Sequence, residues 1–197
     1  LELSVKDYQN IPHKQPLMAV DNSIFQIFDF YLEEGDAANA LSQPFTMVLT
    51  GELARKFLGE QKDYIGKSLA VFWEGSFVDF EVTGILEDIP GNSHVQFNML
   101  LSLSSYPKEA MNAWFGNLQY TYLLLMPGTD YLKLEEKFPP FLKKYVAAEF
   151  LSFFGPDISV TDVFQIKLKP LTDIHLNPSR EFEIGPQGSQ FTVYLFS

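Results

Sequence analysis

The sequence contains no cysteine and only three histidines among 197 residues. Without cysteine, disulfide bonds, thiolate catalysis and thiolate-bound zinc are excluded. His13, His94 and His175 lie far apart and share no i, i+4 spacing, so a two-histidine metal site would need distant residues to meet in space. A hydrogen-bonded turn position is the simpler interpretation of each histidine, and the sequence predicts no metal site.

Other signatures of chemistry are also missing. No apolar run reaches the roughly 18 residues that a membrane-spanning helix requires. The phosphate-binding patterns G-x-G-x-x-G and G-x-x-x-x-G-K-[ST] are absent, and so is the G-x-S-x-G pattern of serine hydrolases. Adjacent carboxylates such as Glu33 and Glu34 are typical of solvated loops. We therefore predict no cofactor and no enzymatic activity.

What the sequence does contain is acidic charge and phenylalanine. Its 25 acidic and 14 basic residues give a formal net charge of −11. This charge disfavours nucleic acid and anionic membrane surfaces, because both attract basic proteins. Phenylalanine supplies 19 residues, and the segment with Phe150, Phe153 and Phe154 lies between a predicted helix and a Gly-Pro turn. We interpret these three residues as a possible partner surface.

Hydrophobic spacing predicts a mixture of strands and helices. Pro12 and Pro16 predict a break in the chain, and residues 33–36 a loop. Thr50 is expected to cap a helix that ends at Gly59. Strands are expected at residues 1–5, 17–20, 45–49, 67–73, 77–86, 120–126 and 164–168, extended chain at 95–103, and helices at 24–28, 51–58 and 130–145.

The second half reads as strand, helix, strand, which predicts a βαβ or split βαβ unit. Its helix contains Pro139 and Pro140, so a kink or two short helices are expected there. The turn at residues 90–93 is the predicted hinge between two subdomains.

An ordered series of short motifs extends over nearly the whole chain. It comprises Val20-Asp21, residues 24–30, Glu34-Gly35-Asp36, Ala40-Leu41, Val48-Leu49-Thr50, residues 54–59, 65–69, 82–86, 88–97 and 170–176. In order and content this series resembles the MacB-like periplasmic core domain of FtsX-like ABC transporter permeases.

The resemblance implies an α+β fold of two small α/β subdomains. Residues 1–90 would be an inserted part with a mixed sheet and helices. Residues 91–197 would be a porter-like βαβ part that leads toward a transmembrane helix, with its first βαβ expected before Leu1. The motif residues would then be structural: Asp21, Phe25, Phe28, Gly35, Thr50, Ala54, Phe57, Gly66, Gly84, Pro90, Asn92, Ser93, His94, Phe97 and His175.

The function implied by the resemblance is non-catalytic. The domain would lie at the periplasmic face of the inner membrane and relay ATP-driven conformational change to a substrate or partner outside. Implied partners are a cytoplasmic ATPase subunit acting through the full-length permease, a second permease copy, an accessory periplasmic protein, and the membrane through flanking helices outside this chain. The alternatives are a free-standing periplasmic binding protein that binds a hydrophobic ligand on its Phe-rich surface, and an extracytoplasmic hydrolase.

Overall fold

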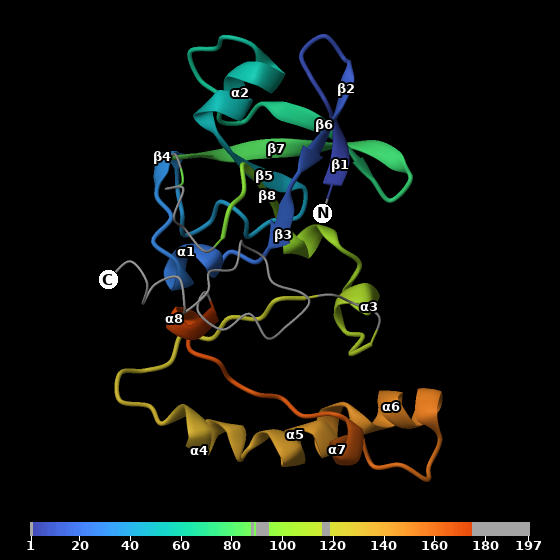
Figure 1. The fold of residues 1–197 in the computed structure, drawn as a ribbon. Coiled ribbons are helices and arrows are strands. Elements are labelled where there is room, and N and C mark those ends of the chain that lie inside the picture. The colour runs from blue at the N-terminus through green and yellow to red at the C-terminus, as the bar shows by residue number, and fades with distance from the viewer. Residues whose placement is uncertain (1, 88, 90–94, 116–118, 175–197) are drawn as a thin grey trace, which may run out of the picture. The chain divides into compact units, whose positions relative to one another are not determined.

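The computed structural model describes residues 2–87, 89, 95–115 and 119–174 (Figure 1). The chain divides into two compact units, Leu1–Met111 and Asn112–Ser197. Strands and helices both occur, which confirms the predicted α+β class. The first unit includes β8 (Met99–Ser102), which pairs with two strands of the sheet in that unit. No helix in the described part of the chain is long and apolar enough to cross a membrane.

One eight-stranded mixed sheet forms the first unit. Its order is β2-β1-β6-β7-β5-β8-β3, and β4 pairs with β7 beside this path. The β5–β7 and β3–β8 pairs are parallel and the others antiparallel. The remaining bounds are β1 (Glu2–Lys6), β2 (Pro12–Pro16), β3 (Met18–Val20), β4 (Leu32–Gly35), β5 (Thr46–Thr50), β6 (Ser68–Trp73) and β7 (Ser76–Leu86).

The connection between β2 and β3 shows that the sheet curls. These strands stand at opposite ends of the strand order, yet only Leu17 separates them in the chain. A single residue can join both ends only if the sheet bends round on itself. Leu17 is 2% exposed and belongs to the core that the curled sheet encloses.

Two loop predictions in this unit were wrong. Pro12 and Pro16 do not break the chain but begin and end β2, the first strand in the sheet order. A strand at that position pairs on one side only, so the missing N–H of proline is tolerated. Residues 33–36 are not all loop, since β4 pairs with the end of β7 through Glu34 and Gly35.

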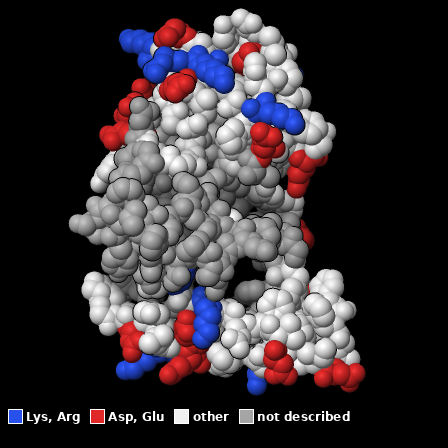
Figure 2. Space-filling model, viewed as in Figure 1, with Lys and Arg blue, Asp and Glu red and all other residues white. Residues whose placement is uncertain are grey.

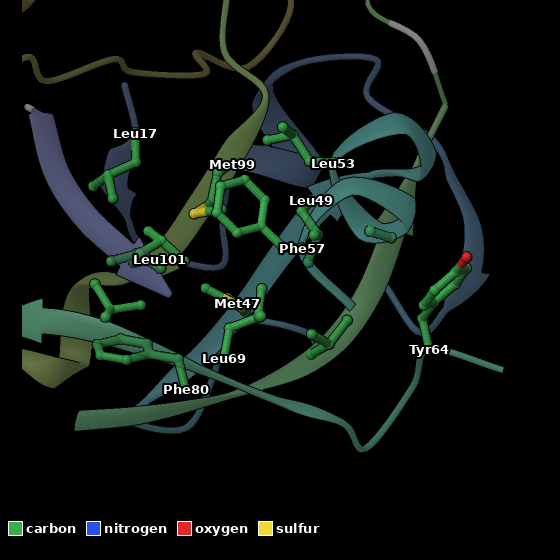
Figure 3. Packing of buried hydrophobic residues seen from close by; sticks show 14 of the residues in the cluster. Leu17, Met47, Leu49, Leu53, Phe57, Tyr64, Leu69, Phe80, Met99 and Leu101 are labelled. Atoms are coloured by element: carbon green, nitrogen blue, oxygen red, sulfur yellow. The ribbon is translucent and has the colours of Figure 1, made fainter. Parts of the chain in front are cut away.

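Helix α2 (Gly51–Leu58) covers the core and confirms the predicted helix. Leu53, Ala54 and Phe57 form its buried face, and Leu53 and Phe57 pack near Leu49 and Met99 of the sheet (Figure 3). The other helices of this unit are short: α1 (Ile24–Ile27), the 3₁₀ helix η1 (Leu103–Ser105) and α3 (Lys108–Met111). The hydrophobic core of the first unit is therefore made by the sheet and one amphipathic helix.

The described part of the second unit is helical. It contains α4 (Tyr131–Glu135), α5 (Phe138–Tyr145), α6 (Ala147–Phe154), α7 (Val160–Val163) and α8 (Leu171–Ile174). Pro139 and Pro140 lie in the first turn of α5, where backbone N–H groups have no intrahelical acceptor. The predicted division into two short helices is confirmed. Leu142, Val146, Phe150 and Val160 form a separate small core.

The two strands predicted in the second unit were wrong. Residues 120–126 and 164–168 have no regular secondary structure. A strand needs a neighbouring strand for its backbone groups, and no described strand pairs with either segment. The predicted strand-helix-strand order is therefore not formed within the described residues.

Candidate functional site

Two motif glycines lie opposite one another on neighbouring strands. Gly35 of β4 pairs with Gly84 of β7. The φ angle of Gly35 is +100°, and a Cβ atom there would lie 2.4 Å from the Thr83 carbonyl oxygen. A Cβ atom on Gly84 would lie 3.0 Å from Leu32 and 3.1 Å from Val48 side-chain atoms. The structure therefore gives both glycines a packing role.

The segment after Gly35 is anchored by polar side chains. Asp36 accepts hydrogen bonds from the Ala38 N–H at 3.0 Å and the Asn39 side chain at 2.8 Å. Asn22 donates to the Ala38 carbonyl at 2.8 Å and accepts from the Leu41 N–H at 2.8 Å. Asn22 was missed in the sequence analysis, because its partners lie well over ten residues away.

Asp21 and Thr50 shape the starts of helices. The Asp21 carboxylate accepts from the Ser23 N–H at 2.8 Å, immediately before α1. Thr50 Oγ1 accepts from the Leu53 N–H at 3.4 Å, which confirms it as the N-cap of α2. Gly66 has a φ angle of +77° in an open turn. These positions set local backbone geometry.

The remaining described motif residues contribute to packing. Ala54 and Phe57 are fully buried in α2. Phe25 and Phe28 are half-buried, and Phe28 stacks on Phe30 with 5.5 Å between ring centroids. Phe97 is buried and meets Phe30 edge-on at 4.9 Å. The motif positions Pro90, Asn92, Ser93, His94 and His175 lie outside the described residues.

His13 is the one histidine among the described residues. Its Nε2 lies 2.8 Å from an Asp7 carboxylate oxygen, and its ring meets Phe57 edge-on at 5.8 Å. Asp7 also accepts the Ile11 and Gln9 N–H groups, and these backbone bonds, together with His13, lower the pKa of its carboxyl. Within the described residues no three metal-ligating side chains gather. His13 therefore lies in strand β2 and not at the predicted turn position, and its side chain contacts Asp7.

In the second unit, two glutamates hydrogen-bond segments without regular secondary structure to helices. Glu149 of α6 accepts hydrogen bonds from the Trp114 N–H at 3.0 Å and the Phe115 N–H at 3.2 Å. Glu135 of α4 accepts from the Leu168 N–H at 2.6 Å and from Lys167 Nζ at 3.2 Å. Since the segments around residues 114 and 168 lack strand partners, these carboxylates provide their attachment.

Glu135 makes the attachment of residue 168 dependent on pH. The Leu168 N–H, opposed in part by burial and assisted by Lys167, holds the pKa of the Glu135 carboxyl below its ordinary value of 4.5. The folded state therefore binds this proton less tightly than the unfolded state does. The ionised Glu135 carboxylate stabilises the folded state fully at pH values above its ordinary pKa. This stabilisation is lost as the pH falls through the lowered pKa of the folded state.

We expect Glu135→Gln to abolish this pH dependence at the Leu168 amide. In the unchanged protein, hydrogen-exchange protection of that amide, corrected for intrinsic rates, should fall as the solution is acidified below the ordinary pKa. In the variant, protection should be low and insensitive to pH. Glu136→Gln, an exposed neighbour, is the control and should behave as the unchanged protein. Equal protection in all three proteins would contradict the attachment.

Phe150, Phe153 and Phe154 occupy different environments. Phe150 is fully buried, so it belongs to the small helical core and not to a surface. Phe153 and Phe154 are 67% and 51% exposed. The helix places Phe150 and Phe154 one turn apart, and their rings stack at 4.6 Å. Two of the three predicted surface residues are therefore accessible.

A hollow of about 230 Å³ lies beside α5 and the segment around residue 166. It is lined by Phe138, Leu142, Phe164 and Ile166, with Glu135 and Lys167 among its polar residues. Pockets that hold small-molecule ligands usually measure about 300–1,000 Å³. The hollow is thus small for a ligand site of that kind.

Comparison with protein families gives a match to the description "MacB-like periplasmic core domain" over residues 4–140. No curated protein matches the sequence. Among solved structures, a domain of a protein described as a permease from Porphyromonas gingivalis is similar, with a TM-score of 0.61 and 28% identity. That alignment covers 73% of this chain and 65% of the other.

Two further solved structures are less similar to this chain. The periplasmic region of MacB from Actinobacillus actinomycetemcomitans aligns with a TM-score of 0.49 and 13% identity, over 73% of this chain and 63% of that one. The extracellular domain of the noncanonic ABC-type transporter YknZ from Gram-positive bacteria aligns with a TM-score of 0.39 and 15% identity, over 53% and 51%. The chain thus spans less than two thirds of each of the three solved structures.

Proposed function

Because this chain belongs to the family of MacB-like periplasmic core domains of ABC transporter permeases, we propose that it relays ATP-driven conformational change to a substrate or partner outside the membrane. In this proposal the domain carries no catalytic site and neither binds nor hydrolyses ATP. It moves against a substrate or partner outside the inner membrane. The family match over residues 4–140 is the observation that carries the proposal.

The internal construction of the chain supports a mechanical role. Each unit has its own hydrophobic core, one enclosed by the curled sheet and one between helices of the second unit. Units with independent cores can move as rigid bodies, which is a common form of conformational switching. The described motif residues all lie in the first unit, where they pack its core and fix local backbone geometry. They therefore serve the proposed relay by keeping the first unit rigid.

The proposed partners follow from the permease assignment. They are a cytoplasmic ATPase subunit coupled through the full-length permease, a second permease copy, and an accessory periplasmic protein. Membrane attachment would occur through flanking helices outside residues 1–197. The domain itself would lie at the periplasmic face of the inner membrane.

The relay can be tested by distance measurements in the full-length permease with its ATPase. The absence of cysteine from residues 1–197 allows spin labels at Lys62→Cys in the first unit and Lys143→Cys in the second, both exposed. Double electron–electron resonance should show a different distribution of distances between the two spin labels when ATP and vanadate trap the ATPase. The shift should disappear with an ATPase variant that cannot bind ATP.

A label pair within one unit provides the matched control. Lys62→Cys with Ser76→Cys lies entirely in the first unit, so its distance should stay constant under the same conditions. Transport that proceeds without any change in the Lys62–Lys143 distance would refute a relay between the units. Saturable, stoichiometric ATP binding by the purified 197-residue chain would also contradict the proposal.

A further inference from the structure

The second unit carries a cluster of phenylalanines with a buried base and an exposed outer part. Phe115 lies at its centre, 5.9 Å from Phe153, 6.2 Å from Phe154 and 5.1 Å from Phe164 between ring centroids. Phe153, Phe154 and Phe164 are 67%, 51% and 37% exposed. We refer to Phe115, Phe153, Phe154 and Phe164 as the aromatic surface. Exposed apolar clusters of this kind commonly mark contact sites.

Two interactions fix the aromatic surface in place. Phe154 stacks on fully buried Phe150. The backbone of Phe115 is attached to α6 through the Glu149 carboxylate. Because these rings are already positioned, a partner would bind them with little loss of side-chain freedom. Rigid aromatic anchors of this type dominate the energetics of many protein interfaces.

The chain segment that carries Phe153, Phe154 and Phe164 has acidic and no basic side chains. Residues 145–166 contain Glu149, Asp157 and Asp162 but no lysine or arginine. The Glu149 carboxylate accepts hydrogen bonds from backbone N–H groups, whereas Asp157 and Asp162 form no ion pair within the described residues. The lysines of this unit lie in residues 133–144 and 167–169. On the visible face, Figure 2 shows acidic and no basic side chains at the α6 end of the unit.

We propose that the aromatic surface docks a segment of a partner protein whose contact face is apolar and flanked by lysine or arginine. The rings supply the apolar contact, and Asp157 and Asp162 favour a basic rim on the partner. The same acids oppose an anionic lipid surface. This inference rests on the proposed function, because it supplies the recognition chemistry of the accessory partner. Its test uses no ATP and can therefore fail or succeed independently of the relay.

The probe is a fluorescent amphipathic Leu/Lys helical peptide, titrated with the 197-residue chain, and a Leu/Glu peptide of the same length is its comparison. We expect one-to-one binding of the Leu/Lys peptide that weakens with added salt. Phe153→Ser combined with Phe154→Ser should raise the Kd by about tenfold or more, as expected for interface anchors. Asp157→Asn with Asp162→Asn should raise the Kd several-fold and reduce its salt dependence.

Matched variants keep the result interpretable. Leu132→Ser on α4 removes an apolar side chain that is 58% exposed but lies outside the aromatic surface, so binding should be unchanged. Phe153→Ser alone leaves the stacked Phe154 in place and should also weaken peptide binding. This single variant keeps the test valid if the double variant does not fold. Equal binding of both peptides, or equal loss with Leu132→Ser, would overturn the proposal. So would Phe153-dependent binding of neutral phosphatidylcholine vesicles in place of the peptide, since that result would identify a lipid contact.

Discussion

Replacing Phe57 with alanine is expected to lower the free energy of unfolding of the first unit by about 3–5 kcal/mol, the usual cost of a buried Phe→Ala change. Phe57 is fully buried on α2 and faces Met99, Leu49 and Leu53 in the enclosed core (Figure 3). Its removal leaves a cavity among closely packed side chains, which relax only in part to fill it. The loss is a large part of the stability of a typical domain.

The measurement is urea unfolding followed by tryptophan fluorescence. The chain has two tryptophans, and Trp73 lies in the same core as Phe57. A Trp114→Phe background therefore makes Trp73 the reporter of the first unit.

Phe57→Leu retains most of the side-chain volume and should lower the free energy of unfolding by less than about 1.5 kcal/mol. Phe72→Ala, at a 41% exposed position paired with Phe77, should cost below about 1 kcal/mol. A similar loss in Phe57→Ala and Phe72→Ala would contradict the assigned packing.

The second large effect is expected for Gly35→Ala. A residue other than glycine in the left-handed region costs about 1–2 kcal/mol. At Gly35 the added Cβ atom would also lie 2.4 Å from the Thr83 carbonyl oxygen, a backbone atom that cannot rotate away. Forcing the two strands apart should add about 1–3 kcal/mol, as overpacking does elsewhere. The combined loss should be detected in the same urea unfolding experiment.

Gly75→Ala is a matched control for the steric part of this effect. Gly75 has a φ angle of +92°, close to that of Gly35, but nothing lies within 4 Å of the position of its Cβ atom. Its substitution should therefore cost only the conformational term of about 1–2 kcal/mol. If the two alanine variants are equally stable, the β4–β7 contact is looser than the structure places it, and the motif glycine has another role.

These expectations separate the motif residues from the aromatic surface. Substitutions at Gly35, Thr50 or Phe57 act on the folding of the first unit. Substitutions at Phe153, Asp157 or Asp162 should leave folding nearly intact and change only binding. A variant that affects transport in the full-length permease can then be assigned to one class by its unfolding curve.

Local sequence determined the elements whose stabilising groups lie close together in the chain. Helix α2 has its cap at Thr50, its buried face at Leu53, Ala54 and Phe57, and its end at Gly59, so spacing alone predicted it. The β6–β7 hairpin has its turn at Glu74 and Gly75 between two alternating segments. In the second unit, the two adjacent prolines forced the separation of α4 and α5. The ordered motif series likewise identified the family.

Tertiary structure decided every feature that depends on a distant partner. Proline-bounded β2 is a strand because it occupies one end of the sheet order, and residues 120–126 form none because no described strand pairs with them. Asn22 was missed because the backbone groups it binds are brought to it only by the fold. Phe150 is buried and Phe153 exposed because the packing of α6 selects one face of that helix. Spacing in a sequence reports local geometry, whereas burial and strand pairing are properties of the assembled chain.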